Sequence, residues 1–174
     1  MTFERILLIR ELFSYNDQNG EVSYKSRYFG PNPSPRQKQW NTRFTGKICG
    51  YLSQGYIRCS AFGKVEFYAH QIAFALMSNF IPEEVDHINL CRSDNKWSNL
   101  RAATRQENAC NCRKRKTNKS GLKGVSWSKS NSRWRMDFEN KGVRYCGYYN
   151  SAVEAYEAYC LMSKIHHKEF GNAQ

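Results

Sequence analysis

Residues 68–108, with the sequence YAHQIAFALMSNFIPEEVDHINLCRSDNKWSNLRAATRQEN, contain the most informative pattern of the chain. Asp86 and His87 are adjacent, Asn99 follows His87 by 12 residues, and Asn108 follows Asn99 by 9 residues. Metal-assisted hydrolysis of a phosphodiester requires a group that activates water and a cation that holds the phosphate. An imidazole beside a carboxylate and two amides supplies these groups. The alternative is a turn pair followed by two helix caps, because a motif alone is no proof of chemistry.

The same segment resembles the His-Asn-His (HNH) nucleases, specifically the branch found in phage homing endonucleases. The resemblance implies an α+β fold with a ββα-metal core (the His-Me finger), in which His87 is the general base and Asn99 braces the loop. It implies Asp86 and Asn108 as metal ligands, and their hard oxygen donors suit Mg²⁺ or Mn²⁺. One departure lies in residues 89–91, which read Asn-Leu-Cys where the family usually has Asp-Gly-Asn, so the glycine that adopts a positive φ easily is missing.

The hydrophobic pattern of residues 68–112 predicts the elements of this nuclease core. Apolar residues at helical spacing predict a helix that begins at His70 and ends before Pro82. Residues 84–88 suit a short strand that presents His87, and residues 100–111 suit a helix that carries Asn108. We expect a structural role for His70 and a solvated position for Glu107.

The composition favours a nucleic-acid partner without proving one. The chain has 27 Lys and Arg against 15 Asp and Glu, a net charge of +12, which suits a protein that neutralises phosphates. Ribosomal or anionic-membrane proteins can be equally basic. The longest apolar runs, residues 6–9 and 72–77, are too short for a membrane span, and the start has no cleavage site of a signal peptide. We expect a protein in the cytoplasm, that of a bacterial host cell if a phage encodes it.

Seven cysteines invite a disulfide or zinc interpretation. An odd number in an intracellular chain argues against a disulfide framework. No pair has the spacing of a zinc knuckle, since Cys110 and Cys112 are too close to chelate one ion comfortably. Reduced structural thiols are the favoured interpretation, and a zinc site assembled from scattered positions stays open.

Residues 1–67 are predicted to form a small mixed N-terminal module. Apolar residues at helical spacing predict a helix over residues 2–13, followed by a turn at Asn19-Gly20 and a strand-like pattern. Three prolines between residues 31 and 35 predict an irregular loop. Short strand candidates follow at residues 46–52, 56–62 and 64–69.

Residues 113–120 form a basic linker. Such a run is usually a solvated linker, but between two DNA-binding units it suits tracking of phosphates, and its composition would also suit a nuclear-localisation signal. Its expected DNA contacts are Arg113, Lys114, Arg115, Lys116 and Lys119.

Residues 121–174 predict a three-stranded antiparallel sheet packed on one helix. Strand patterns at residues 123–128, 133–139 and 143–149 are separated by turn residues. Ser151 and Glu154 form a capping box for the helix that follows.

This region resembles the ethylene-response-factor (APETALA-type) DNA-binding domain of plants, which also occurs fused to HNH nucleases. The resemblance covers about 50 residues and includes Ser120-Gly121, Lys123-Gly124-Val125, Trp134, Gly147 and Tyr149. It implies that the uncovered face of the sheet enters the major groove. Its implied contacts are Lys123, Ser126, Ser128, Arg133, Arg135 and Tyr145, with Arg144 as a flanking phosphate contact. The alternative is an ordinary surface of a sheet.

Together these patterns predict a site-recognising, metal-dependent endonuclease of the homing type that acts on double-stranded DNA. We expect 5′-phosphate and 3′-hydroxyl products. A single catalytic set and the lack of heptads predict a monomer, without an obligate protein partner, that nicks one strand. The main alternative is a DNA-binding regulator with a degenerate nuclease core, and a weaker one is a structure-directed RNA-cleaving enzyme.

Overall fold

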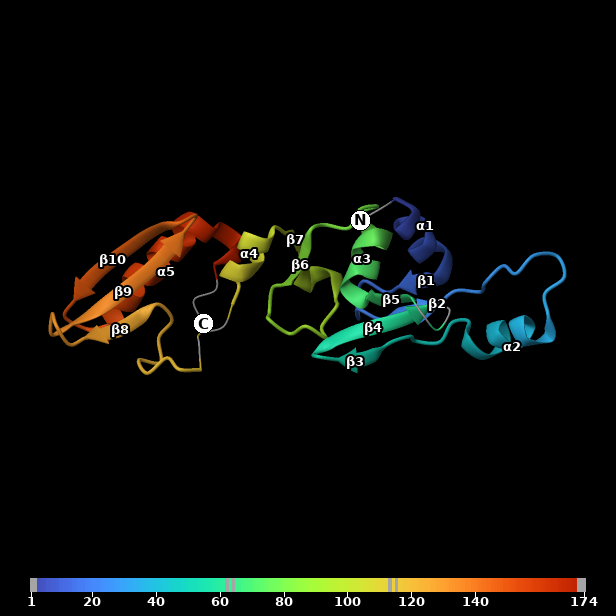
Figure 1. Ribbon diagram of the computed structural model, residues 1–174, viewed down its shortest axis with the longest axis horizontal. Helices are drawn as coiled ribbons and strands as arrows, with labels where there is room; N and C mark the ends of the chain where they lie inside the picture. Colours follow the sequence, from blue (N-terminus) through green and yellow to red (C-terminus); the bar gives the residue numbers. More distant parts are fainter. Residues whose placement is uncertain (1–2, 62, 64, 113, 115, 172–174) are drawn as a thin grey trace. The chain divides into compact units, whose positions relative to one another are not determined.

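The computed structural model describes residues 3–61, 63, 65–112, 114 and 116–171 of the chain (Figure 1). Packing divides the chain into two compact units, residues 1–103 and residues 104–174. The first unit contains α1 to α3 and β1 to β7, and the second contains α4, α5 and β8 to β10. Helices and strands thus occur together throughout the chain, which confirms the predicted α+β composition.

The first unit begins with a helix and a β-hairpin. Helix α1 (Phe3–Leu12) buries Ile6, Ile9 and Leu12, the residues at helical spacing. Strand β1 (Phe13–Tyr15) pairs antiparallel with β2 (Val22–Tyr24). The predicted helix and the turn after it are therefore confirmed.

A three-stranded antiparallel sheet and helix α3 build the centre of this unit. The sheet has the order β3-β4-β5, and its strands and α3 run over Tyr51–Ser53, Tyr56–Ala61, Val65–Tyr68 and Ala69–Met77. Ile9, Phe13, Phe67 and Ile72, none more than 1% exposed, belong to one core. This core contains residues on both sides of position 67. The predicted boundary at residue 67 therefore divides sequence patterns and does not separate two hydrophobic cores.

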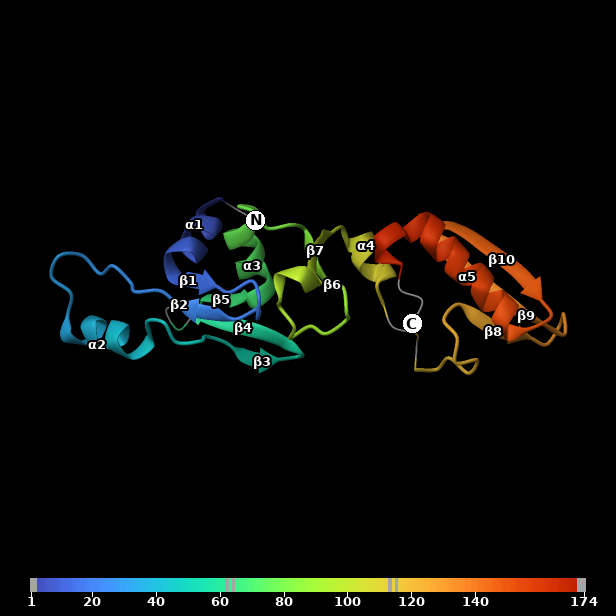
Figure 2. The ribbon, with the colours of Figure 1, turned by 180° about the vertical axis from the view of Figure 1, so that it is seen from behind.

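Helix α2 (Pro35–Phe44) follows a long excursion of the chain after β2 (Figures 1 and 2). The prolines predicted an irregular loop, but the last of them, Pro35, occupies the first turn of this helix. Proline suits that position because its missing N–H would have no intrahelical partner there. Ser34 and Gln37 form a capping box that fixes the start of the helix.

The segment that follows α3 forms a second hairpin. Strand β6 (Glu84–His87) pairs antiparallel with β7 (Leu100–Ala103), and a 3-10 helix (Trp97–Asn99) precedes β7. The predicted strand at His87 is confirmed, but the predicted helix over residues 100–111 is wrong at its start. Residues 100–103 are extended because each pairs with a residue of β6, and the helix α4 (Arg105–Cys110) begins only after the capping box of Thr104 and Glu107.

The second unit contains a three-stranded antiparallel sheet with α5 along one face (Figure 2). Strands β8, β9 and β10 run over Val125–Ser128, Arg133–Asn140 and Val143–Tyr149, and α5 runs over Ala152–His167 before a 3-10 helix, Lys168–Phe170. Val125, Met136, Phe138, Ala155 and Tyr159 form the core between sheet and helix. The predicted sheet with one packed helix is thus confirmed. Within the described ranges, no helix is long and apolar enough to cross a membrane.

Candidate active site and nucleic-acid interface

Asp86 lies on β6, directly opposite Arg101 of β7. Its carboxylate accepts hydrogen bonds from Nε and a terminal nitrogen of Arg101 at 2.7 and 2.6 Å. Only 3% of Asp86 is exposed, and a buried carboxylate needs such a partner because removing a charge from water is costly. The sequence pattern singled out Asp86 but missed Arg101, whose role depends on the strand pairing.

His87 ends β6 and is 5% exposed. Its Nε2 lies 3.2 Å from Oδ1 of Asn95, while Nδ2 of Asn95 donates to the carbonyl of Ser93 at 3.2 Å. The Asn95 amide therefore turns its oxygen to the ring, so Nε2 carries the proton and the lone pair lies at Nδ1. Burial lowers the pKa of His87, against the opposing effect of Asn95. A neutral imidazole with its lone pair at Nδ1 is the form that a general base requires.

Asn99 joins the two ends of the loop between β6 and β7. Its Oδ1 accepts from the backbone N–H of Asn89 at 2.9 Å, and its Nδ2 donates to the carbonyl of Asp94 at 2.7 Å. These bonds are those that a loop-bracing residue would make. Leu90 adopts a φ of +61°, so the loop keeps a positive φ at the position where the family has glycine.

The hairpin of β1 and β2 supports this loop from outside residues 68–108. The hydroxyl of Tyr15 donates to the carbonyl of Asn95 at 2.7 Å, and the carbonyl of Asp17 accepts from the N–H of Trp97 at 3.1 Å. Gly20, at φ +79°, approaches so closely that a Cβ there would lie 2.6 Å from the backbone of Asn95. The sequence showed Gly20 as a turn residue, and nothing in it indicated this contact.

Aromatic rings pack against the other side of His87. The ring of His70 meets the ring of His87 edge-on, with 5.2 Å between the ring centroids. The ring centroid of Tyr56 lies 5.5 Å from that of His70 and 6.1 Å from that of His87. Tyr68 stacks on His70 at 5.2 Å. Burial, with His87 as a secondary cause, lowers the pKa of His70 to about 3, so the ring stays neutral. This packing suits the structural role that we expected for His70.

Asn108 lies on α4 in the second unit, one residue after Glu107 of the capping box. The carboxylate of Glu107 accepts hydrogen bonds from the backbone N–H and the hydroxyl of Thr104 at 2.8 and 2.9 Å. Glu107 therefore caps the start of α4. Among the described residues, no group of three or more His, Cys, Asp or Glu could hold a metal ion. A site here would depend on carboxylate and amide oxygens, donors that suit Mg²⁺ because this ion keeps several waters.

The open face of the second unit's sheet carries five of the seven DNA contacts predicted for residues 121–174, namely Ser126, Ser128, Arg133, Arg135 and Arg144. Cross-strand pairing places Ser126 beside Arg135 and Ser128 beside Arg133 on this face. Arg133 is exposed, whereas Arg135 and Arg144 both form ion pairs with Asp137, at 2.9 and 2.6 Å. Asp137 was not among the predicted site residues, because its role depends on the arginines that the strand pairing brings beside it.

Tyr145 lies on the opposite face from the other predicted contacts of the sheet, and Lys123 makes hydrogen bonds within its own unit. Tyr145 pairs with the buried Phe138 across the strands and packs on the ring of His166 at 5.1 Å, so it belongs to the face that α5 covers. Strand alternation explains this, because a residue opposite a core residue shares its face. Lys123 donates to the carbonyls of Cys110 and Cys112 at 3.3 and 2.8 Å.

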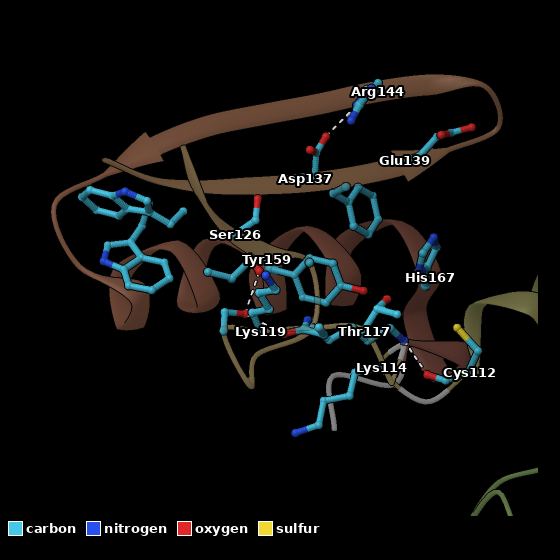
Figure 3. A pocket seen from close by; sticks show the side chains of 18 of the residues that line it. Cys112, Lys114, Thr117, Lys119, Ser126, Asp137, Glu139, Arg144, Tyr159 and His167 are labelled. Atoms are coloured by element: carbon cyan, nitrogen blue, oxygen red, sulfur yellow. Dashed lines mark hydrogen bonds and ion pairs between the residues drawn. The ribbon is translucent and has the colours of Figure 1, made fainter. Parts of the chain in front are cut away.

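The basic linker borders a pocket of about 960 Å³ in the second unit (Figure 3). Lys119, Trp127 and Tyr159 are among its lining residues. Lys114 donates to the carbonyl of Gly121 at 2.7 Å, and Lys116 and Lys119 are exposed. The two other predicted linker contacts, Arg113 and Arg115, lie outside the described residues.

The segment that contains Asp86, His87 and Asn99 matches a known protein family. Residues 67–110 match the family model of the HNH endonucleases, so the chain contains an HNH endonuclease domain where the sequence predicted one. Protein 3.8 of Escherichia phage T7 is 45% identical over 61 residues, which cover 35% of this chain and 50% of that protein. The chain thus spans about half the length of this relative. No solved structure matches the chain.

Proposed function

We propose that this protein is a metal-dependent endonuclease that recognises a site in double-stranded DNA and hydrolyses its phosphodiester bonds. The observation that carries the proposal is the buried pair Asp86-His87 inside the HNH domain, where burial favours the neutral form of His87 and Asn95 orients its ring. A protein that only binds DNA needs no such base. The strongly positive chain supplies affinity for the polyanion.

In the proposed reaction, Nδ1 of His87 takes a proton from a water molecule aligned with the phosphorus. The oxygen of this water forms a bond to phosphorus as the bond to the 3′ oxygen breaks. The departing oxygen takes a proton from solvent, which leaves 5′-phosphate and 3′-hydroxyl ends. Asp86 and Asn108 would hold Mg²⁺ or Mn²⁺, which when bound stabilises charge on the departing oxygen. Asn99 keeps the loop closed so that His87 stays in position.

The strands β6 and β7 are followed in the chain by α4, the order of elements in a ββα-metal core, and we assign this segment to that fold. For the second unit, the order of three antiparallel strands and one helix supports an ethylene-response-factor-like DNA reader. Ser126, Ser128, Arg133 and Arg135 would face the groove, and Arg144 and the linker would contact phosphates.

Cleavage of supercoiled plasmid tests the proposal. Wild-type protein should cut with Mg²⁺ or Mn²⁺ and not with a chelator. His87→Ala should lower the rate by about 10²- to 10⁴-fold, the usual contribution of a general base, while DNA binding stays near normal. His166→Ala, which removes a histidine of the second unit, is the matched control and should still cut. Binding without cutting by the wild type would instead support the regulator.

We further propose a homing-type nickase that acts as a monomer in the cytoplasm of a bacterial host. The order of the products tests the nicking and the monomer. One catalytic set holds one scissile phosphate, so open circles should form before linear plasmid, at a rate first order in protein. Direct appearance of linear product, with a steeper dependence on protein concentration, would show that a dimer cuts both strands.

A further inference from the structure

The positive charge of the first unit is concentrated around helix α2. Between Glu21 and Glu66 the sequence has eight Lys and Arg residues and no Asp or Glu, although the whole chain has 15 carboxylates. Arg36, Lys38 and Arg43 lie within α2, and Arg27 packs on Trp40 of this helix. Lys25 and Lys47 precede and follow the helix in the sequence. No neighbouring carboxylate in the sequence can neutralise them locally.

Helix α2 has two distinct faces. Gln37, Trp40, Asn41 and Phe44 are half-buried and lie on the side toward the rest of the unit. The other side is exposed and, after Pro35 in the first turn, consists of cations and neutral hydrogen-bonding residues: Arg36, Lys38, Gln39, Thr42 and Arg43. We call this side the outer face of α2. It contains no large apolar residue, so it lacks the apolar face with which amphipathic helices enter membranes.

The half-buried side of α2, which we call its inner face, contacts the rest of the unit although none of the helix residues is fully buried. The guanidinium of Arg27 lies 3.6 Å from the ring centroid of Trp40. The side chain of Asn41 exchanges two hydrogen bonds of 2.9 Å with the backbone of Arg27. The ring of Tyr24 meets the rings of Trp40 and Phe44 edge-on, with centroid distances of 5.6 and 6.0 Å. These contacts, with the capping box, fix the direction in which the outer face points.

The cations of the outer face are available to a partner. Within the described part of the chain, Arg36 and Lys38 form no ion pair or hydrogen bond through their side chains, and Arg43 contacts only the ring of Phe44 at 5.2 Å. Seven residues separate Arg36 from Arg43, a rise of about 10 Å along the helix. One DNA strand offers about three phosphates over that length, at about 3.4 Å each.

We propose that the outer face of α2 binds the phosphate backbone of double-stranded DNA. This inference rests on the proposed function, because it takes the substrate of the HNH domain as the ligand, and it adds a contact in the first unit to those of the linker and the second unit. The contact is independent of sequence, since guanidinium and ammonium groups on phosphates carry no base information. Its role is to increase affinity and to orient the duplex.

Equilibrium binding to a duplex of arbitrary sequence tests the proposal without cleavage. The full chain is titrated in the presence of a chelator over a range of salt concentrations. Arg36→Gln/Lys38→Gln/Arg43→Gln should weaken binding at least about tenfold at low salt and reduce the slope of log K against log salt by about two to three, since each phosphate contact contributes about 0.9. Arg10→Gln/Lys164→Gln/Lys168→Gln removes the same charge from three other exposed positions and should change the slope by less than one.

Three outcomes would overturn the proposal. Equal losses in both triple variants would show that only net charge matters. Unchanged binding by the α2 variant would show that the outer face does not contact DNA. Tighter binding of the wild type to an RNA hairpin than to the duplex, lost in the α2 variant, would identify RNA as the ligand.

Failure of this proposal and failure of the proposed function are distinguishable. A wild type that cuts plasmid while the α2 variant binds normally would reject only the α2 contact. A wild type that never cuts while the α2 variant loses affinity would reject the nuclease and keep the contact. Thermal unfolding of each variant establishes that the losses do not come from misfolding.

Discussion

The hairpin of β6 and β7 with its loop, and the open face of the second unit's sheet, both use polar side chains, but they hold them in opposite ways. Asp86, His87 and Asn99 are 3, 5 and 7% exposed and make hydrogen bonds within their own unit. On the sheet, Ser126 and Arg133 are exposed. A reacting group needs a fixed position and a set protonation state, whereas a group that reads DNA must be reachable from solvent.

The two regions also use their carboxylates differently. Asp86 is buried and forms an ion pair with Arg101. Asp137 lies at the surface between Arg135 and Arg144 and pairs with both. Surface pairs of this kind contribute little to stability, so in the proposed complex Arg135 and Arg144 can leave Asp137 for groups of the DNA at small cost. Substitutions in the loop should therefore act on stability and catalysis, and those on the sheet on binding.

The largest expected effect tests how the hairpin of β1 and β2 holds the loop. Gly20→Ala would place a Cβ 2.6 Å from the backbone of Asn95 at a φ of +79°. The positive φ costs about 1–2 kcal/mol, and overpacking adds about 1–3 kcal/mol. Gly30→Ala is the matched control, because Gly30 has a φ of +84° with nothing within 4 Å. Denaturant unfolding and plasmid cleavage should show the larger loss for Gly20→Ala. Equal losses would mean that the close approach does not matter.

The second prediction concerns the buried His70. Its pKa falls from 6.5 to about 3 on folding, so the unfolded chain binds the proton first and stability falls as the pH drops below 6.5. The loss attributable to His70 between pH 7 and pH 5 is about 2 kcal/mol. Urea unfolding measures the free energy of unfolding at both pH values. Between pH 7 and pH 5, this free energy should fall by about 2 kcal/mol less for His70→Phe than for the wild type. The same pH dependence in both proteins would contradict the burial argument.

The third prediction separates base reading from phosphate contact on the open face. Arg133→Ala should cost about 1–3 kcal/mol of binding free energy at one base position and relax specificity there. Arg144→Ala should weaken binding evenly across sequences, because we assign it to a phosphate. Selection of preferred sites from a randomised DNA library checks both. If only Arg144→Ala lost specificity, Arg144 would be the residue that reads a base and Arg133 the one that contacts phosphate.

The smallest expected effect tests the strain at Leu90. Its φ of +61° is unfavourable for a residue with a side chain, and glycine relieves that strain but loses more entropy on folding. Leu90→Gly should therefore raise stability by about 0.5–1 kcal/mol, measured by urea unfolding, with little change in cleavage. Gln54→Gly, at a φ of +52° in the turn between β3 and β4, controls for the backbone effect. A stabilised control beside a destabilised Leu90→Gly would show that the leucine side chain itself supports the loop.

The sequence by itself determined the features that depend on short-range pattern. Turn residues and strand alternation sufficed for β8, β9 and β10, and helical spacing sufficed for α1 and α3, because each signal lies within the element it describes. The spacing of Asp86, His87, Asn99 and Asn108 likewise predicted the HNH domain that the family model matches. This was possible because the number of residues between them can be counted in the sequence.

Only the tertiary structure decided features that depend on partners distant in the chain. Leu100–Ala103 has no strong strand pattern and is extended because β6 offers hydrogen bonds to it. Tyr145 belongs to the core face because its cross-strand partner is Phe138. Arg101, Asn95 and Gly20 act on the site through contacts with residues 8 to 75 positions away. Such contacts gain their free energy from packing and pairing in the folded chain, so no local pattern specifies them.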